Sequence, residues 1–181
     1  AGMGDIMPVF PLSISGSVSG PRRFPLALAA GTKAPAFTLV SQDNEKVSLS
    51  DYSGRNLVIA IFPAVFSGVC DTEMCTFRDM SDQFNSVDAD VVGISVDGRW
   101  SNNEFATKLN LGFPILSDYS RATIRAYDVV FPNFGGLEGY DAAVRSVFVV
   151  DKTDNIRWTW TAPQPGIEPD YDEIQREVNS L

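Results

Sequence analysis

The stretch IFPAVFSGVCDTEMCTFRD, residues 61–79, holds both cysteines of this 181-residue chain. It overlaps the end of an apolar run, NLVIAIFP at 56–63, which is typical of a strand buried in the centre of a sheet. Residues spaced by four, three and seven positions then form one apolar face of a predicted helix: Cys70, Met74, Phe77 and Phe84. The stretch therefore predicts a strand, a loop and a helix that carries both thiols.

Strands and helices alternate along the rest of the chain. The sequence predicts helices at 67–84, 102–110, 122–127 and 171–181, and strands at 56–63, 90–97, 113–118, 144–151 and 155–162. The turn-like KTD between the last two strands favours an antiparallel hairpin. Two right-handed β-α-β crossovers followed by a hairpin and a helix predict an α/β fold with a mixed central sheet flanked by helices.

Residues 1–30 differ in composition from the rest, because they are rich in Pro, Gly and Ser and show no sustained period. One short strand is expected at 9–15. Arg22 and Arg23 follow the apolar part instead of preceding it, which does not suit a signal peptide. We expect residues 1–30 to form a partly flexible N-terminal extension, and residues 31–181 to form one domain.

The overall composition narrows the class of protein. A hydrophobic content of 44% and a charged content of 20% are typical of a globular domain. A net charge of −9 argues against nucleic acid or an anionic membrane as partner, because both would repel the chain. No apolar run approaches the length that spans a bilayer. Two cysteines are too few for a disulfide framework.

The chain contains no histidine. This excludes Ser-His-Asp and Cys-His catalysis and removes the usual zinc and iron sites. No metal and no cofactor is expected. Chemistry must therefore depend on cysteine, carboxylate, arginine or hydroxyl groups.

Cys70 is the candidate nucleophile, because its position favours the thiolate that reacts. Ser67 is expected to cap the helix, with its hydroxyl accepting a hydrogen bond from an early helical amide. Cys70 then lies in the first turn, where the N–H groups and the helix dipole stabilise an anion. The carboxyl end of a buried strand is also where open α/β sheets bind ligands. The alternative is that Cys70 is a small apolar residue on the buried face of the helix.

The segment PAVFSGVC at 63–70 resembles the peroxiredoxin signature Pro-x-x-x-Thr/Ser-x-x-Cys. The similarity continues through DTEMCTFRD at 71–79, and residues 31–63 resemble the amino-terminal strand hairpin of that family. Four further motifs follow in the expected order: VVGISVD, FPILSD, IRAYDV and VRSVFVVD. Over residues 31–181 the chain is similar to the AhpC/TSA superfamily, which implies a thioredoxin-like fold.

The resemblance implies a role for each matching residue. Cys70 corresponds to the peroxidatic cysteine, whose thiolate attacks a peroxide and becomes a sulfenic acid. Ser67 would hydrogen-bond the thiolate and the bound peroxide, and Pro63 would shield the pocket from water. Arg145 matches the active-site arginine, which would stabilise the negative charge at sulfur. Glu73 matches a glutamate that orients the arginine.

Other readings of these residues stay open. Arg145 can be an ordinary charge at a strand edge, and Arg78 and Asp79 are expected to be structural. The sequence departs from the commoner family pattern at Asp71, where threonine is usual, and at Ser67, which lacks the methyl group of threonine.

Cys75 is the only candidate resolving cysteine in the chain. Its spacing resembles that of the bacterioferritin comigratory protein, or peroxiredoxin Q, subgroup. Five residues along an α-helix place the two Cα atoms roughly 8–9 Å apart, whereas a disulfide needs about 4.4–6.8 Å. Resolution by Cys75 would therefore require the first helical turns to unwind. The alternative is a one-cysteine enzyme related to the AhpE subgroup, with Cys75 structural.

The resemblance implies a thiol-dependent peroxidase that reduces hydrogen peroxide, organic hydroperoxides or both. It implies a thioredoxin-like or other dithiol reductant, a monomer or homodimer, and a cytoplasmic location. A second candidate function is a thiol-disulfide oxidoreductase or a redox sensor without peroxidase activity, since fold does not dictate function.

Overall fold

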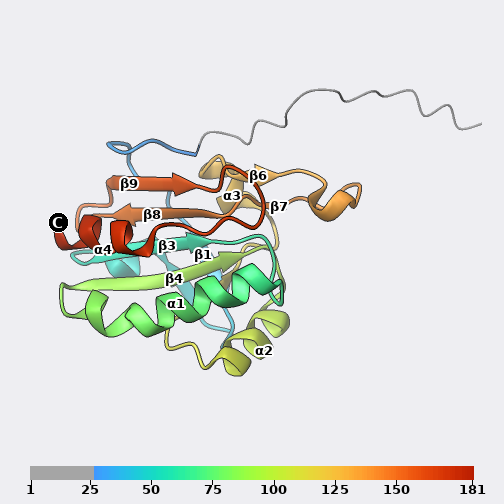
Figure 1. Cartoon of the computed structure of the whole chain (residues 1–181), viewed down its shortest axis with the longest axis horizontal. Helices are drawn as coiled ribbons and strands as arrows, with labels where there is room; N and C mark the ends of the chain where they lie inside the picture. Colours follow the sequence, from blue (N-terminus) through green and yellow to red (C-terminus); the bar gives the residue numbers. More distant parts are fainter. Residues whose placement is uncertain (1–26) are drawn as a thin grey trace, which may run out of the picture.

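The computed structural model describes residues 27–181, so the strand expected at 9–15 lies outside the described residues. A seven-stranded sheet forms the centre of the molecule, in the order β2-β1-β5-β4-β3-β8-β9 (Figure 1). Its strands are β1 (Thr38–Ser41), β2 (Lys46–Ser48), β3 (Asn56–Ile61), β4 (Ala89–Ser95), β5 (Ile115–Ser117), β8 (Ser146–Val150) and β9 (Ile156–Thr161). Every residue of β3 is buried, as its continuous apolar sequence predicts.

The sheet is mixed, which confirms the predicted fold class. β3, β4 and β5 pair in parallel through two crossovers, which run by way of α1 (Gly68–Asn85) and α2 (Arg99–Leu109). β8 lies antiparallel to β3, with Ile61 opposite Ser146, and β9 completes the predicted hairpin. β1 and β2 form the expected amino-terminal hairpin. The last residues of β3 and the first of β8 are thereby adjacent, although they are distant in sequence.

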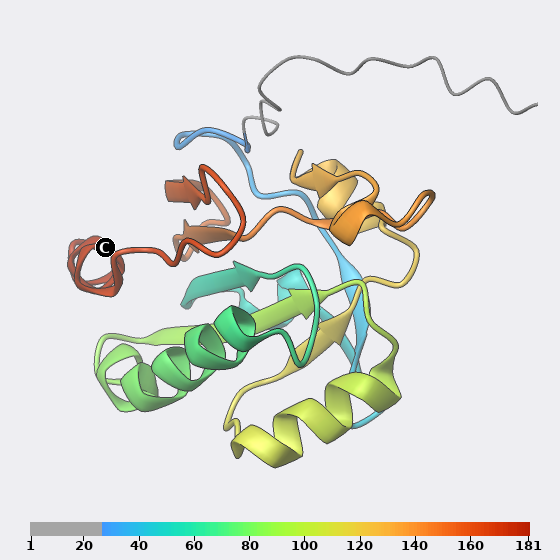
Figure 2. The ribbon, with the colours of Figure 1, turned by 45° about the vertical axis from the view of Figure 1, so that its right-hand side comes forward.

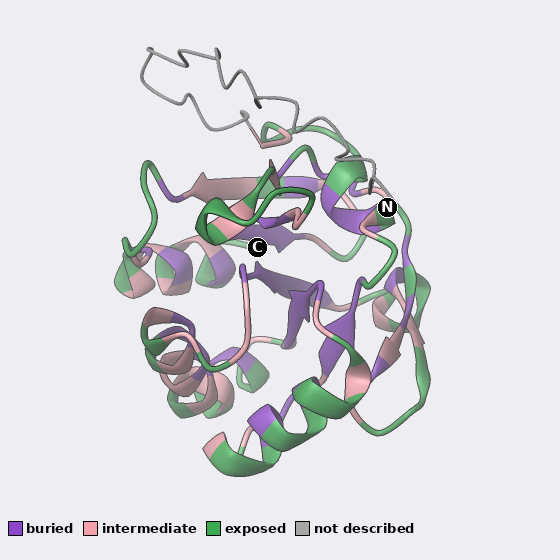
Figure 3. Cartoon of the chain, turned by 90° about the vertical axis from the view of Figure 1, so that its right-hand side faces the viewer, coloured by how far each residue is buried: buried purple, intermediate pink, exposed green. Residues whose placement is uncertain are grey.

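Helices cover both faces of the sheet (Figures 2 and 3). Val58 and Ala60 of β3 face the side where α1, α2 and α4 (Tyr171–Asn179) pack, whereas Leu57 and Ile59 face α3 (Ala122–Ala126) and the 3-10 turn η1 (Leu49–Tyr52). This alternation follows from the period of two along a strand. Complete burial of such an aliphatic side chain contributes about 1.5–3 kcal/mol. No helix among residues 27–181 is long and apolar enough to cross a membrane.

Two short strands, β6 (Val130–Phe131) and β7 (Ala142–Ala143), form a separate antiparallel ladder that the sequence does not predict. Between them the chain makes the 3-10 turn η2 (Phe134–Gly136). Beyond β7 the main sheet resumes at Ser146, two residues later than predicted, so Arg145 lies in the connection just before β8.

Candidate active site

The β3–α1 loop, residues 62–67, leads from the central strand into α1. Parallel pairing continues to Phe62, whose N–H donates to the carbonyl of Ile94 at 3.0 Å. The ladder ends there, and Pro63, which follows, pairs with no residue of β4. The helix then begins at Gly68 with Ser67 as its N-cap residue. Cys70 therefore lies in the first turn, as predicted, and its side chain is fully buried.

The hydroxyl of Ser67 does not cap the helix as expected. Within residues 27–181 it accepts no hydrogen bond from an α1 amide. Instead, Ser67 Oγ lies 2.8 Å from Cys70 Sγ and 3.1 Å from the carbonyl oxygen of Ala64. One hydroxyl proton serves one acceptor at a time, and a charged sulfur is the stronger acceptor. The hydroxyl is therefore placed to donate to a Cys70 thiolate.

Arg145 reaches the same sulfur from the connection that leads into the neighbouring strand, β8. Ile61 and Ser146 are opposite each other in the β3–β8 ladder, which brings Arg145 to the start of the β3–α1 loop. Its Nη2 lies 3.2 Å from Cys70 Sγ, and its Nη1 donates to Oε2 of Glu73. The Arg145 side chain is 4% exposed and that of Glu73 is fully buried. The structure thus brings together Cys70, Ser67, Glu73 and Arg145.

The surroundings of the buried pair, Glu73 and Arg145, shift the pKa of both side chains. Burial raises the pKa of Glu73 to about 7, although the charge of Arg145 acts in the opposite direction. Burial alone would lower the pKa of Arg145, but the charges of Glu73 and Cys70 outweigh it and raise this pKa. Arg145 is therefore a permanent cation held beside the Cys70 sulfur.

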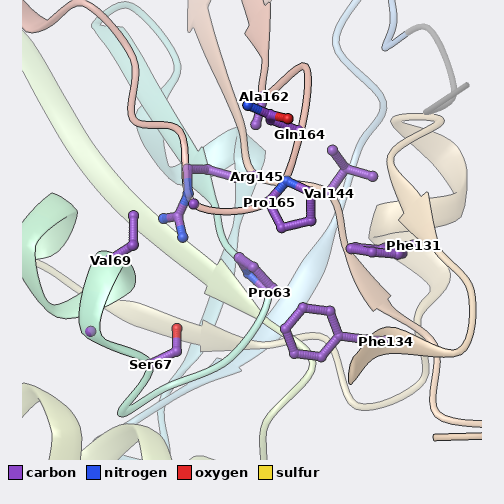
Figure 4. Close-up of a pocket in the computed structure, with 12 residues that line it drawn as sticks. Pro63, Ser67, Val69, Phe131, Phe134, Val144, Arg145, Ala162, Gln164 and Pro165 are labelled. Carbon is purple, nitrogen blue, oxygen red and sulfur yellow. The ribbon is translucent and has the colours of Figure 1, made fainter. Parts of the chain in front are cut away.

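A cavity of about 200 Å³ opens above these residues (Figure 4). Pro63, Ser67 and Arg145 form part of its lining. Most of the remaining walls are apolar: Val69, Phe131, Phe134, Val144, Ala162 and Pro165. Pro63 and Phe134 are thus both part of the wall of one cavity.

The aromatic and carboxyl-terminal walls of this cavity were not predicted from the sequence. Phe131 is the last residue of β6, Phe134 is the first residue of η2, and residues 164–166 come from the turn after β9. Their signals were the loop FPNFGGLEGY at 131–140 and the loop APQPG at 162–166. Both are rich in Gly or Pro, which marks loops without indicating what they enclose.

Cys75 lies one turn further along α1 and is half-buried. Both cysteines are free thiols in the described part of the chain. Cys75 Sγ lies 3.7 Å from Nη1 of Arg78, which also donates to the carbonyl of Leu109 at 2.6 Å. Arg78 is further paired with Asp79 at 2.8 Å. Arg78 thus ties α1 to the last residue of α2.

The mixed sheet and its buried, arginine-paired cysteine define a thioredoxin-like protein with a thiol site. A sequence profile of the AhpC/TSA family matches residues 30–159, and the chain belongs to this family of peroxiredoxins. In overall fold the chain is similar to the crystal structure of peroxidoxin BcpB from Mycobacterium tuberculosis, with a TM-score of 0.76 and 24% identity. That match covers 85% of this chain and 98% of the other.

Curated relatives have names from the predicted subgroup. The chain is 34% identical over 137 residues to peroxiredoxin Bcp of Bacillus subtilis, which covers 75% of this chain and 86% of the relative. It is 35% identical over 133 residues to the chloroplastic peroxiredoxin Q of Oryza sativa subsp. japonica. That match covers 74% of this chain and 59% of the rice protein, so the chain spans less than two thirds of its length. The predicted family is confirmed.

Proposed function

We propose that this protein is a thiol-dependent peroxidase in which Cys70 is the nucleophile. The observation that carries the proposal is the pair of donors at one sulfur, Ser67 Oγ at 2.8 Å and Arg145 Nη2 at 3.2 Å. Charged sulfur is the reactive form, and hydrogen-bond donors aimed at it stabilise that form. The adjoining cavity gives a peroxide a place beside Ser67 and Arg145.

In the proposed reaction the Cys70 thiolate attacks the terminal oxygen of a hydroperoxide. An S–O bond forms as the O–O bond breaks, which gives the sulfenic acid and an alkoxide, and the alkoxide takes a proton from water to leave as an alcohol. Arg145 stabilises the negative charge as it moves from sulfur to the leaving oxygen. Glu73 holds the guanidinium in place through Nη1.

The shape of the cavity supports organic hydroperoxides as substrates in addition to hydrogen peroxide. A volume of about 200 Å³ exceeds several times the roughly 30 Å³ that one water molecule occupies in the liquid. Its walls are formed mainly by apolar side chains, including Phe134 and Val144. Phe134→Asp should therefore reduce turnover of cumene hydroperoxide more than turnover of hydrogen peroxide. Equal effects on both substrates would argue against substrate binding at this wall.

Cys75 is the proposed resolving cysteine. Its thiolate would attack the sulfur of the Cys70 sulfenic acid, so that a disulfide forms and hydroxide leaves. The start of α1 is suited to the unwinding that this requires. Thr72 and Thr76 donate their hydroxyls to the carbonyls four residues back, at 3.1 and 2.9 Å, a bond that weakens and bends helices. The competing proposal is a one-cysteine enzyme, in which Cys75 remains bound to Arg78 and an external thiol resolves Cys70.

Intact mass after one equivalent of hydrogen peroxide tests both steps on the fully reduced chain. A loss of about 2 Da that dithiothreitol reverses would indicate a Cys70–Cys75 disulfide, and Cys75→Ser should convert it to a gain of about 16 or 32 Da. The same gain in the unsubstituted chain would support the one-cysteine cycle. An unchanged mass would refute the peroxidase itself, and Cys70→Ser provides the matched negative control.

The remaining features of the proposed function concern partners and location. We propose a thioredoxin-like or other dithiol reductant and a monomer or homodimer, without nucleic acid or membrane partners. A net charge of −9 supports this last point. A cytoplasmic location and the division into an extension at 1–30 and a domain at 31–181 also remain predictions. The rice relative is named as chloroplastic.

A further inference from the structure

The motif VVGISVD at 91–97 ends in a carboxylate that reaches the β3–α1 loop. β4 runs parallel to β3, so the two carboxyl ends meet at one edge of the sheet. The last backbone hydrogen bond between them runs from the N–H of Phe62 to the carbonyl of Ile94. The next contact is made by a side chain, since the N–H of Val65 donates to Oδ2 of Asp97 at 2.9 Å. The Asp97 carboxylate therefore links the β3–α1 loop to the end of β4 beyond the point where the two strands pair.

The residue after Val65 has a strained backbone. Phe66 has a φ of 59°, in the left-handed region that a bulky side chain rarely adopts. Such a conformation persists only when neighbouring contacts hold it. On one side is the Asp97–Val65 hydrogen bond. On the other, the ring of Phe66 packs edge-on against Phe105 of α2, with 5.5 Å between ring centroids.

Asp97 is itself held firmly in place. Its N–H donates to Ser95 Oγ at 3.2 Å, and its carbonyl oxygen accepts from Ser117 Oγ at 2.5 Å. Ser95 and Ser117 are opposite each other in the β4–β5 ladder and are both buried. The backbone of Asp97 is therefore anchored to two strands of the sheet, and its carboxylate extends from this fixed position to the loop.

We propose that Asp97 is a positioning residue for the reaction at Cys70, which holds the β3–α1 loop so that the Ser67 hydroxyl points at the sulfur. Ser67 directly follows Phe66, so a change in the Phe66 backbone rotates Ser67 away from its 2.8 Å contact with Cys70 Sγ. Asp97 is not among the residues that line the cavity, and its carboxylate accepts its hydrogen bond from Val65, not from the catalytic residues. The inference rests on the proposed peroxidase function, because it assigns a support for that site.

Substitution of Asp97 in the full-length chain tests this inference. The quantity measured is the second-order rate constant for oxidation of the reduced protein by hydrogen peroxide. Remaining thiols are alkylated at each time point and counted by mass spectrometry. Asp97→Ala should lower this rate constant by about 100-fold, since a displacement near 1 Å in an active site has an effect of that order. Asp97→Asn should retain most of the rate, because its amide oxygen still accepts from Val65. If Asp97→Ala does not fold, Asp97→Ser replaces it, because the serine side chain is too short for its oxygen to accept from the Val65 N–H.

Asp151→Ala is the matched control. Asp151 also holds a turn by accepting backbone N–H groups, those of Thr153 and Asn155, but in the β8–β9 hairpin. Asp151→Ala should lower the unfolding temperature without lowering the rate of oxidation by hydrogen peroxide. The inference is overturned if Asp97→Ala reacts at the wild-type rate, or if Asp97→Asn is as slow as Asp97→Ala. An unsubstituted chain that does not react with peroxide would instead overturn the proposed function.

Discussion

The buried carboxyl group of Glu73 should make the stability of the protein depend on pH. Burial raises its pKa from 4.5 to about 7 in the folded chain, against the opposing charge of Arg145. Between these two values the folded chain holds a proton that the unfolded chain has released. The contribution of Glu73 to stability is therefore complete below pH 4.5 and is lost as pH rises through about 7.

The size of this effect follows from the linkage between protonation and folding. Each pH unit between the two pKa values is equivalent to 1.36 kcal/mol, so the free energy of unfolding should fall by about 3 kcal/mol between pH 4.5 and 7.5. Glu73→Gln removes the titrating group but keeps the shape of the side chain. The difference in unfolding free energy between the wild type and Glu73→Gln should therefore shift by about 3 kcal/mol over this range.

Urea unfolding of the reduced protein at several pH values measures this difference. Glu104→Gln, on the exposed side of α2, is the matched control and should leave the profile unchanged. Repeating the comparison in a Cys70→Ala background removes any contribution from the thiol. Parallel profiles for wild type and Glu73→Gln, or a wild type that gains stability relative to the variant as pH rises, would contradict a raised pKa of Glu73 in the folded chain.

Three further substitutions test the site and the core. Arg145→Gln should lower the rate of Cys70 oxidation by roughly 10²–10³-fold, because it removes one donor to a developing charge. A rate within threefold of wild type would contradict the assigned contact. Ser67→Ala should lower the same rate by about tenfold, whereas Ser67→Thr keeps the hydroxyl and should keep the rate. Gly93→Ala would place its Cβ 2.5 Å from Ile115 Cδ1, so calorimetry should show a destabilisation of about 1–3 kcal/mol with an unchanged oxidation rate. An unchanged unfolding temperature would show that Ile115 yields without cost.

The main sheet was largely predictable, because its signals are local. The apolar run at 56–63 indicates β3, and the spacing of Cys70 and Phe77 indicates the buried face of α1. By contrast, β6 and β7 have two residues each, too few to show a period, and they form only because their chain segments meet in space. The wall that contains Phe134 was therefore not foreseen.

The geometry of the site depends on contacts that local patterns do not encode. Only resemblance to a family linked Arg145 to Cys70, because their proximity follows from the β3–β8 register. The capping role predicted for the Ser67 hydroxyl from its position was wrong, whereas its contact with Cys70 was expected only from the resemblance. Capping is the usual role of a serine at that position, but here the neighbouring sulfur competes successfully for its proton.

The pairing of β3 with β8 also has a consequence for how the protein folds. Cys70 and Arg145 are 75 residues apart, so their contact forms only after a long loop has closed. A growing chain exposes the cysteine to its surroundings well before the arginine has been synthesised. We expect peroxide sensitivity of Cys70 during refolding to rise with formation of the β3–β8 ladder, later than helix content measured by circular dichroism. The reactivity of the Cys70 thiol would then report on the pairing of β8 with β3 during folding.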